Sequence, residues 1–143
     1  MSCTDVVKLL DGLRVLVVED EPLIGMAVEE AIRDAGGLAE HVDSDRAAYS
    51  RLQDGARTLD ALIVDVNLGE GTTGFDVARF ARRLNARLPV VYLSGGPEEW
   101  ATWFGVDDAT FLAKPVTDAE LVQTIARLSG REDGPPCQMP HPA

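Results

Sequence analysis

The chain has 143 residues, of which 45% are hydrophobic and 26% charged, with 13 Gly and 8 Pro, and these values exclude collagen-like, disulfide-rich and wholly disordered proteins. A chain of this length can bury a sizeable core as one domain without a metal or a disulfide. The formal net charge of −11 at pH 7 disfavours attraction to a phosphate backbone, so direct binding to nucleic acid is not expected.

The first 37 residues predict an arm, a strand and a helix. Residues 1–12 form an N-terminal arm or an extra helical turn. Leu13–Val18 is rich in β-branched residues, which predicts a buried strand, and the acidic cluster Glu19-Asp20-Glu21 follows it directly. Pro22 then opens a helix that Gly36-Gly37 ends. The predicted apolar face of this helix consists of Ile24, Ala27, Val28, Ala31, Ile32 and Ala35.

The next segment predicts two strands with a helix between them. Leu38–Val42 reads as a short strand, and Ser44 is a good N-cap for a helix that Gly55 can close. The third apolar run, Leu59–Val66, holds one charged residue, Asp65, near its carboxyl end. A glycine-rich stretch and a further helix follow this strand.

Two more strands are predicted in the C-terminal half. Pro89–Leu93 predicts the fourth strand, and Pro97 starts a fourth helix. This helix is expected to be short, because only eleven positions separate Ser94 from Gly105. Thr110–Ala113 then predicts the fifth strand.

The last helix begins at a predicted capping box formed by Thr117 and Glu120. Residues 131–143 hold four of the eight prolines, and a disordered tail is expected there.

Taken together, the predicted elements are five short strands that alternate with five helices over residues 13–130. This order predicts the α/β class, with a doubly wound five-stranded parallel sheet covered by helices on both faces.

Cysteine usage and hydropathy indicate the compartment. Cys3 and Cys137 lie in the two terminal segments, at a spacing that suggests neither a structural disulfide nor a CxxC-type metal site. No run approaches the roughly 18 apolar residues of a membrane span. We therefore expect a cytoplasmic protein without membrane insertion.

Polar residues follow four of the five predicted strands. Strand ends deliver Glu19 and Asp20, then Asp65, Ser94 and Lys114. Ligands of open α/β sheets bind outside the carboxyl ends of the strands, so these side chains are expected to converge. Two unit charges ~4 Å apart repel by about 4 kcal/mol at an effective dielectric near 20, and three acids therefore need compensation. Mg²⁺ suits such a site, because it binds few carboxylates and retains several waters.

The motifs at these strand ends resemble those of response-regulator receiver domains in two-component signalling. They read VLVVEDEP, LIVDVNLGEGTTG, YLSG and FLAKP, and the resemblance covers about residues 13–129. Each motif alone is weak, but their order and their placement at strand ends are specific. The resemblance implies a flavodoxin-like receiver fold and a phosphoryl group accepted from a histidine kinase or phosphotransfer protein.

The resemblance also implies roles for single residues. Asp65 is implied to be the phosphoacceptor. Mg²⁺ is implied to be bound by Asp20, Asp65 and the backbone carbonyl of Asn67, with Glu19 helping through water. The physical chemistry agrees, because a carboxylate that attacks a phosphoryl group needs cations to absorb charge on the equatorial oxygens. Glu19 stands where the family more often has Asp, which gives this acid a longer reach.

Two further residues are implied to contact the phosphoryl oxygens, Ser94 and Lys114. The product adds roughly −1.5 to −2 charge, which can pull the Ser94 hydroxyl inward and let the aromatic ring of Phe111 follow, so that both residues act as a switch.

The stretch PVVYLSGG also resembles the signature of a single-domain receiver subfamily. Because only 13 residues follow Gly130, we expect no attached output domain. A downstream protein would read the signal, and the only reactions catalysed would be the chain's own phosphorylation and dephosphorylation.

Simpler interpretations of these residues stay open. The acidic cluster can be favoured by a helix dipole, Asp65 can be a turn residue, Lys114 can be a solvated lysine, Ser94 can belong to an ordinary loop, and Phe111 can be core packing. Gly69-x-Gly71-x-x-Gly74 matches a dinucleotide-binding spacing, although its first glycine lies four residues after Asp65. The alternative functions are a receiver-like module that signals without phosphorylation and a nucleotide-binding or hydrolytic α/β enzyme.

Overall fold

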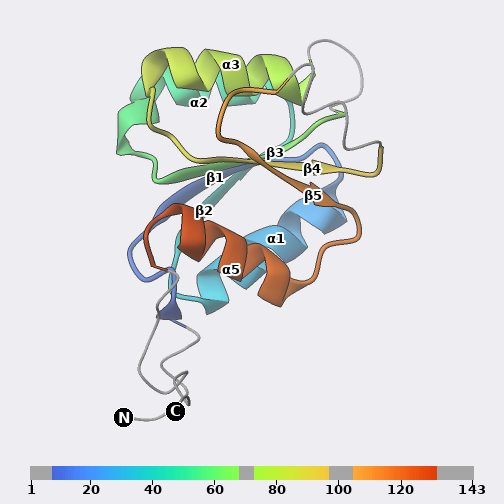
Figure 1. Ribbon diagram of the computed structural model, residues 1–143. Coiled ribbons are helices and arrows are strands. Elements are labelled where there is room, and N and C mark those ends of the chain that lie inside the picture. Colours follow the sequence, from blue (N-terminus) through green and yellow to red (C-terminus); the bar gives the residue numbers. More distant parts are fainter. Residues whose placement is uncertain (1–7, 68–72, 97–104, 132–143) are drawn as a thin grey trace.

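The computed structural model describes residues 8–67, 73–96 and 105–131 (Figure 1). Its centre is a five-stranded sheet of parallel strands in the order β2-β1-β3-β4-β5. The strands are β1 (Arg14–Val18), β2 (Leu38–Val42), β3 (Ala61–Asp65), β4 (Val90–Ser94) and β5 (Thr110–Ala113). The helices are α1 (Pro22–Asp34), α2 (Asp45–Gly55), α3 (Gly74–Leu84) and α5 (Asp118–Leu128), and Ala56–Thr58 form a 3₁₀ turn.

This architecture confirms the predicted doubly wound α/β fold. Helices α1 and α5 cover one face of the sheet, and α2 and α3 cover the other (Figure 1). The predicted short fourth helix over residues 97–104 lies outside the described residues. Among the helices that are described, none has both the length and the apolarity needed to cross a membrane.

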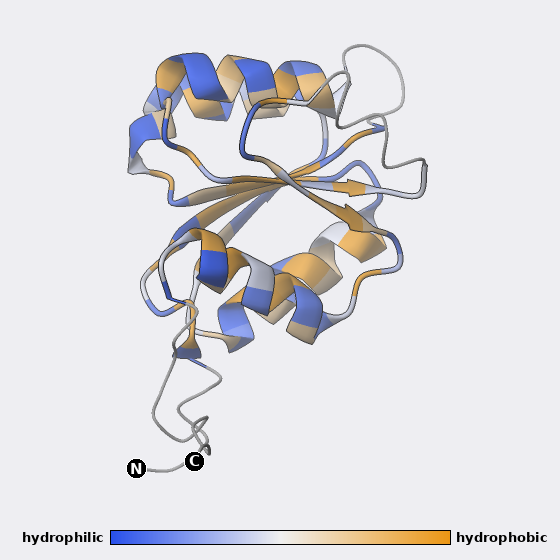
Figure 2. Ribbon diagram, in the orientation of Figure 1, coloured by the Kyte–Doolittle hydropathy of each residue, from blue (hydrophilic) through white to orange (hydrophobic). Residues whose placement is uncertain are grey.

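The sheet divides the core into two apolar layers, and the strands are apolar between the two helical layers (Figure 2). In β1 the side chains of Val15 and Val17 join the layer under α1 and α5, whereas Leu16 and Val18 join the layer under α2 and α3. Successive strand residues point to opposite faces, so a strand covered on both sides must be apolar at every position. This explains the unbroken apolar runs in the sequence.

Side chains cap three of the helices. The Ala47 N–H donates to Ser44 Oγ at 3.1 Å at the start of α2, as predicted, and the Glu120 N–H donates to Thr117 Oγ1 at 3.1 Å at the start of α5. A reciprocal capping box at α3, which the sequence analysis did not identify, joins Thr73 and Asp76. The backbone N–H of Thr73 is the main reason that the pKa of Asp76 lies below its usual value.

Two local expectations were wrong. The third strand begins at Ala61 and not at Leu59, because Leu59 is the C-cap of the 3₁₀ turn formed by residues 56–58, and its N–H donates to Ala56 O. Ala27, expected on the buried face of α1, is exposed and lines an open groove of about 420 Å³ between α1 and the β5–α5 connection. The connection before α5 does not cover Ala27. In this part of α1 the buried residues are Gly25 and Val28.

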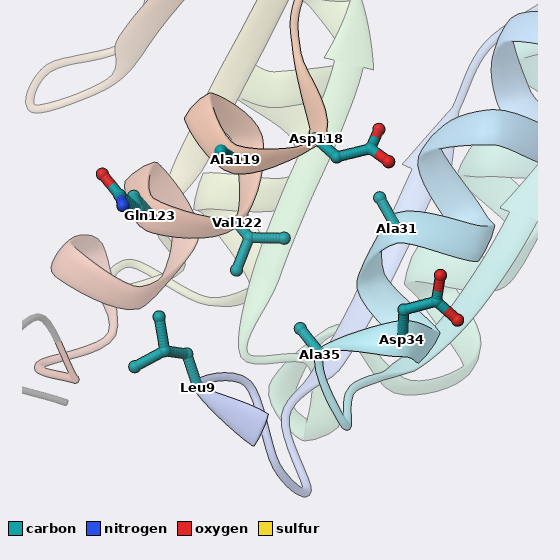
Figure 3. Close-up of a pocket in the computed structure, with 8 residues that line it drawn as sticks. All are labelled: Leu9, Ala31, Asp34, Ala35, Asp118, Ala119, Val122 and Gln123. Carbon is teal, nitrogen blue, oxygen red and sulfur yellow. The ribbon is translucent and has the colours of Figure 1, made fainter. Parts of the chain in front are cut away.

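The described part of the N-terminal segment packs on the domain. Leu9 and Leu10 are buried in the α1–α5 layer, and the Leu10 N–H donates to Ala35 O at 2.9 Å. Figure 3 shows Leu9 near Val122 of α5 and near Ala35, the residue that follows α1, where it lines a groove of about 270 Å³.

Candidate functional site

Strand register brings the predicted polar residues to one edge of the sheet. Val18 pairs with Val64, Asp65 with Leu93, and Ser94 with Ala113, so β1, β3, β4 and β5 end at the same level. Residues that end or directly follow these strands therefore lie side by side. This is the carboxyl edge at which open α/β sheets bind ligands.

Asp65 lies at the centre of this edge, and both of its carboxylate oxygens accept hydrogen bonds. Oδ1 accepts from the Asn67 N–H at 3.0 Å, and Oδ2 accepts from Lys114 Nζ at 3.1 Å. The lysine is 49 residues further along the chain. Asp65 is buried at the end of the central strand of the sheet, and its bond from Asn67 ties the carboxylate to the segment that follows β3.

Glu19 is the most deeply buried of the acids, with 0% of its surface exposed. Its Oε2 accepts from the Glu21 N–H at 3.2 Å. Its Oε1 lies 3.2 Å from Lys114 Nζ as an ion pair, but among the described residues it has no partner at hydrogen-bond geometry. A buried carboxylate oxygen without a hydrogen bond is costly, so this atom indicates that something else completes the site.

Three carboxylates share this site. Oxygen atoms of Glu19, Asp20 and Asp65 all lie within 4.8 Å of one another, and Asp20 is the most exposed of the three. Lys114 supplies a single positive charge beside them. Burial, together with the hydrogen bond and negative charge of Asp65, raises the pKa of Glu19 to about 7. For Lys114, burial lowers the pKa, but the hydrogen bonds and charges of the two acids outweigh it and the pKa lies above its usual value.

The donor set fits a hard divalent cation. Carboxylate oxygens are the ligands that Mg²⁺ prefers, and Glu19 Oε1, which has an ion pair with Lys114 but no hydrogen bond among the described residues, is an oxygen that a cation would satisfy directly or through water. Glu19, Asp20 and Asp65 are the residues that would hold it. The structure adds for Asn67 that its N–H is directed to Asp65, while a metal-binding role for its carbonyl stays a prediction.

Ser94 is buried at the end of β4, next to the β3 strand that carries Asp65. Its Oγ accepts from the Gly96 N–H at 2.9 Å, and its backbone oxygen accepts from the Lys114 N–H at 2.9 Å. The second bond ties the position of Lys114 to the end of β4. The predicted contact of the Ser94 hydroxyl with a phosphoryl group stays a prediction.

Phe111 lies on β5 opposite Tyr92 of β4 and is half-buried. It packs against the layer under α2 and α3 together with Val106 and Ala109. The Tyr92 hydroxyl accepts from the Val106 N–H at 2.9 Å, which ties the segment before β5 to β4. Phe111 therefore packs as the simpler interpretation predicted, and its switch role stays a prediction.

The sequence analysis did not identify why position 74 must be glycine. A Cβ added to it would lie 2.1 Å from the backbone oxygen of Asp65, and its own N–H donates to Val66 O at 2.9 Å. The start of α3 thus touches the main chain at Asp65, and only glycine fits. The last glycine of the dinucleotide-like spacing has a local structural cause, and the other two lie outside the described residues.

His41 and Gly25 were also missed. His41 Nε2 lies 2.9 Å from the backbone oxygen of Glu19, and its ring lies against Gly25 of α1. No local pattern in the sequence connects these three positions, which are contributed by β2, the β1–α1 loop and α1.

The fold and this edge cluster together define a class. The family described as the response regulator receiver domain matches residues 15–126, which is most of the chain. The protein therefore belongs to the response regulator receiver family of two-component systems, as its motifs predicted. Receiver domains bind Mg²⁺ at an acidic site and interact with histidine kinases or phosphotransfer proteins.

Curated relatives are regulatory proteins. The transcriptional regulatory protein TcrA of Mycobacterium tuberculosis is 32% identical over 124 residues, which cover 85% of this chain and 48% of that protein. The phyllosphere-induced regulator PhyR of Methylorubrum extorquens is 25% identical over 113 residues, which cover 79% of this chain and 42% of that protein. The chain thus spans about half the length of the curated relatives it matches.

Solved receiver structures superpose on the chain. A response regulator receiver protein from Sinorhizobium medicae has a TM-score of 0.79 at 30% identity, covering 85% of this chain and 97% of the other. The receiver domain of the sensor histidine kinase PA1611 from Pseudomonas aeruginosa has a TM-score of 0.72 at 25% identity, covering 83% and 98%. That structure has a magnesium ion coordinated in its active-site cleft.

Proposed function

We propose that this chain is a phospho-accepting signalling receiver, which takes a phosphoryl group from a histidine kinase or phosphotransfer protein onto Asp65 and then binds a downstream protein differently. The observation that carries the proposal is the setting of the Asp65 carboxylate. It lies between Lys114 and the Asn67 N–H and beside a buried Glu19 oxygen that lacks a hydrogen bond.

In the transfer step, a carboxylate oxygen of Asp65 attacks phosphorus and forms an acyl phosphate. The bond from phosphorus to the donor's imidazole nitrogen breaks, and its electron pair stays on that nitrogen. Asp65 is held for this step by two hydrogen bonds, so little reorganisation is needed. Lys114 already contacts the carboxylate and can follow the charge onto a phosphoryl oxygen.

Charge balance makes a cation part of this proposal. In the part of the chain that the structure describes, the site has three acids and one lysine, and the transferred group adds roughly −1.5 to −2 charge. A magnesium ion bound by Glu19, Asp20 and Asp65 would supply positive charge for the phosphoryl oxygens. Lys114 alone cannot neutralise this sum. The chain then acts only on its own carboxylate, and we propose no reaction on another substrate.

The readout that we propose runs through Ser94 and Phe111. The Ser94 hydroxyl accepts the Gly96 N–H in this structure, and turning toward a phosphoryl oxygen would break that bond at the start of the β4–β5 connection. Half-buried Phe111 lies on the neighbouring strand, where a change of packing can follow. The proposed result is an altered surface for a downstream protein.

Intact mass before and after acetyl phosphate with Mg²⁺ tests this function. The parent chain should gain about 80 Da, the mass of one phosphoryl group. Asp65→Asn should gain nothing, and Asp54→Asn, an exposed acid on α2, should behave as the parent does. A full gain in Asp65→Asn would overturn the acceptor assignment. No gain in the parent would favour the alternative, a receiver that works without phosphorylation.

A further inference from the structure

The β1–α1 loop that carries Glu19 and Asp20 is anchored to the edge strand β2 at two points. The Glu19 N–H donates to Val42 O at 3.1 Å, and His41 Nε2 lies 2.9 Å from Glu19 O. A carbonyl oxygen only accepts, so Nε2 carries the hydrogen and donates it. Both backbone groups of Glu19 are therefore bonded to β2, one of them by a side chain.

Helix α1 makes room for the same imidazole. A Cβ built on Gly25 would lie 2.2 Å from both Cε1 and Nε2 of His41, so the ring occupies the space that any other residue's Cβ would need. Glycine inside a helix is less favourable than alanine, and here it is buried in α1. The ring thus fits between the helix and the loop, and Gly25 is the residue that permits it.

This position matters because the loop sets the direction of two carboxylates. The Glu19 Oε2 accepts from the Glu21 N–H, and its Oε1 is the buried oxygen without a partner at hydrogen-bond geometry among the described residues. A shift of the Glu19 main chain would move both oxygens and the neighbouring Asp20. Groups that orient metal ligands are known to change metal affinity without touching the metal.

We propose that His41 is a positioning residue of the cation site, which holds the Glu19 carbonyl so that the carboxylates of Glu19 and Asp20 converge with that of Asp65. This inference rests on the proposed function, since it assigns His41 to the same site. In this role His41 supplies one N–H donor at a fixed place, and Gly25 leaves the space that its ring occupies. If His41 only filled space, the shape of its side chain would matter and its hydrogen bond would not.

Three variants separate these roles. His41→Phe keeps a ring over Gly25 and removes the donor, whereas His41→Gln keeps a donor and removes the ring. Glu40→Gln is the matched control, because it alters the adjacent exposed residue of β2, whose partner Arg51 lies away from the loop. Thermal unfolding of each variant shows whether the domain stays folded.

The experiment is calorimetric titration of the full chain with Mg²⁺ alone, with amide exchange measured at Glu19, Asp20 and Glu21. We expect the Kd of His41→Phe to rise three- to tenfold and exchange in the loop to quicken. We expect His41→Gln to stay within about threefold of the parent and Glu40→Gln to match it. A His41→Phe variant that is folded and binds Mg²⁺ with the parent Kd would overturn the inference, as would equal losses in the Phe and Gln variants.

The two proposals fail separately in this design. The parent chain is also treated with acetyl phosphate. A parent that binds Mg²⁺ but gains no phosphoryl mass would overturn the proposed function while the Kd series still decides the role of His41. A parent that gains mass, with a folded His41→Phe variant of unchanged Kd, would overturn only the positioning role.

Discussion

Replacing Glu19 with Gln should stabilise the metal-free protein at pH 8 and leave its stability nearly unchanged at pH 5. The folded-state pKa of Glu19 is raised from 4.5 to about 7, chiefly by burial and then by the hydrogen bond with Asp65. Between these two values the folded protein holds a proton that the unfolded chain has lost. Stability therefore falls as pH rises through this window, and the full penalty is present above pH 7.

The size of the effect follows from the same two values. A difference of 2.5 pKa units, at about 1.36 kcal/mol each, gives an upper bound of about 3 kcal/mol. Gln also loses the ion pair between Glu19 Oε1 and Lys114 Nζ, which offsets part of the gain. We therefore expect the variant to be more stable than the parent by about 1–3 kcal/mol at pH 8.

Urea unfolding in EDTA at several pH values between 5 and 8 measures this difference. The quantity of interest is the variant's free energy of unfolding minus that of the parent, because other titrating groups cancel in it. Glu30→Gln, at an exposed position of α1, is the control and should give a flat difference. A flat difference for Glu19→Gln, or a variant less stable than the parent at pH 8, would refute the electrostatic account of this site.

Two further predictions concern the contacts of Asp65. Lys114→Gln removes the lysine charge beside Glu19 and Asp65, and it should slow phosphorylation by acetyl phosphate at least about tenfold in a mass time course. The control Lys8→Gln, at an exposed lysine, should match the parent. A normal rate in Lys114→Gln would remove the lysine from the mechanism. Gly74→Ala places a Cβ 2.1 Å from Asp65 O and should lower the free energy of unfolding by about 1–3 kcal/mol in urea, whereas Gly95→Ala, with open space around it, should change it little. Equal effects of the two alanines would contradict the close approach of α3 to Asp65.

Local patterns in the sequence predicted most of the described strands and helices and singled out the polar residues that meet at the carboxyl edge of the sheet. Ser44 and Thr117 cap helices through hydrogen bonds to residues three positions away, so neighbouring letters contain the whole interaction. Asp65 stands out because a single charge after an apolar run has few structural uses. Membership of the receiver family also follows from short motifs and their order, and the family match confirms it.

The tertiary structure alone decided how these residues meet. Lys114 reaches Asp65 across 49 positions because β5 and β3 flank β4 in register, and no local periodicity contains that register. The raised pKa of Glu19 depends on its burial and on Asp65, a residue from another strand. Gly25 fits the His41 ring, and Gly74 the Asp65 main chain, because separate elements approach more closely than a Cβ allows. Such contacts depend on distances between elements, which packing sets and which the spacing of residues along one element does not encode.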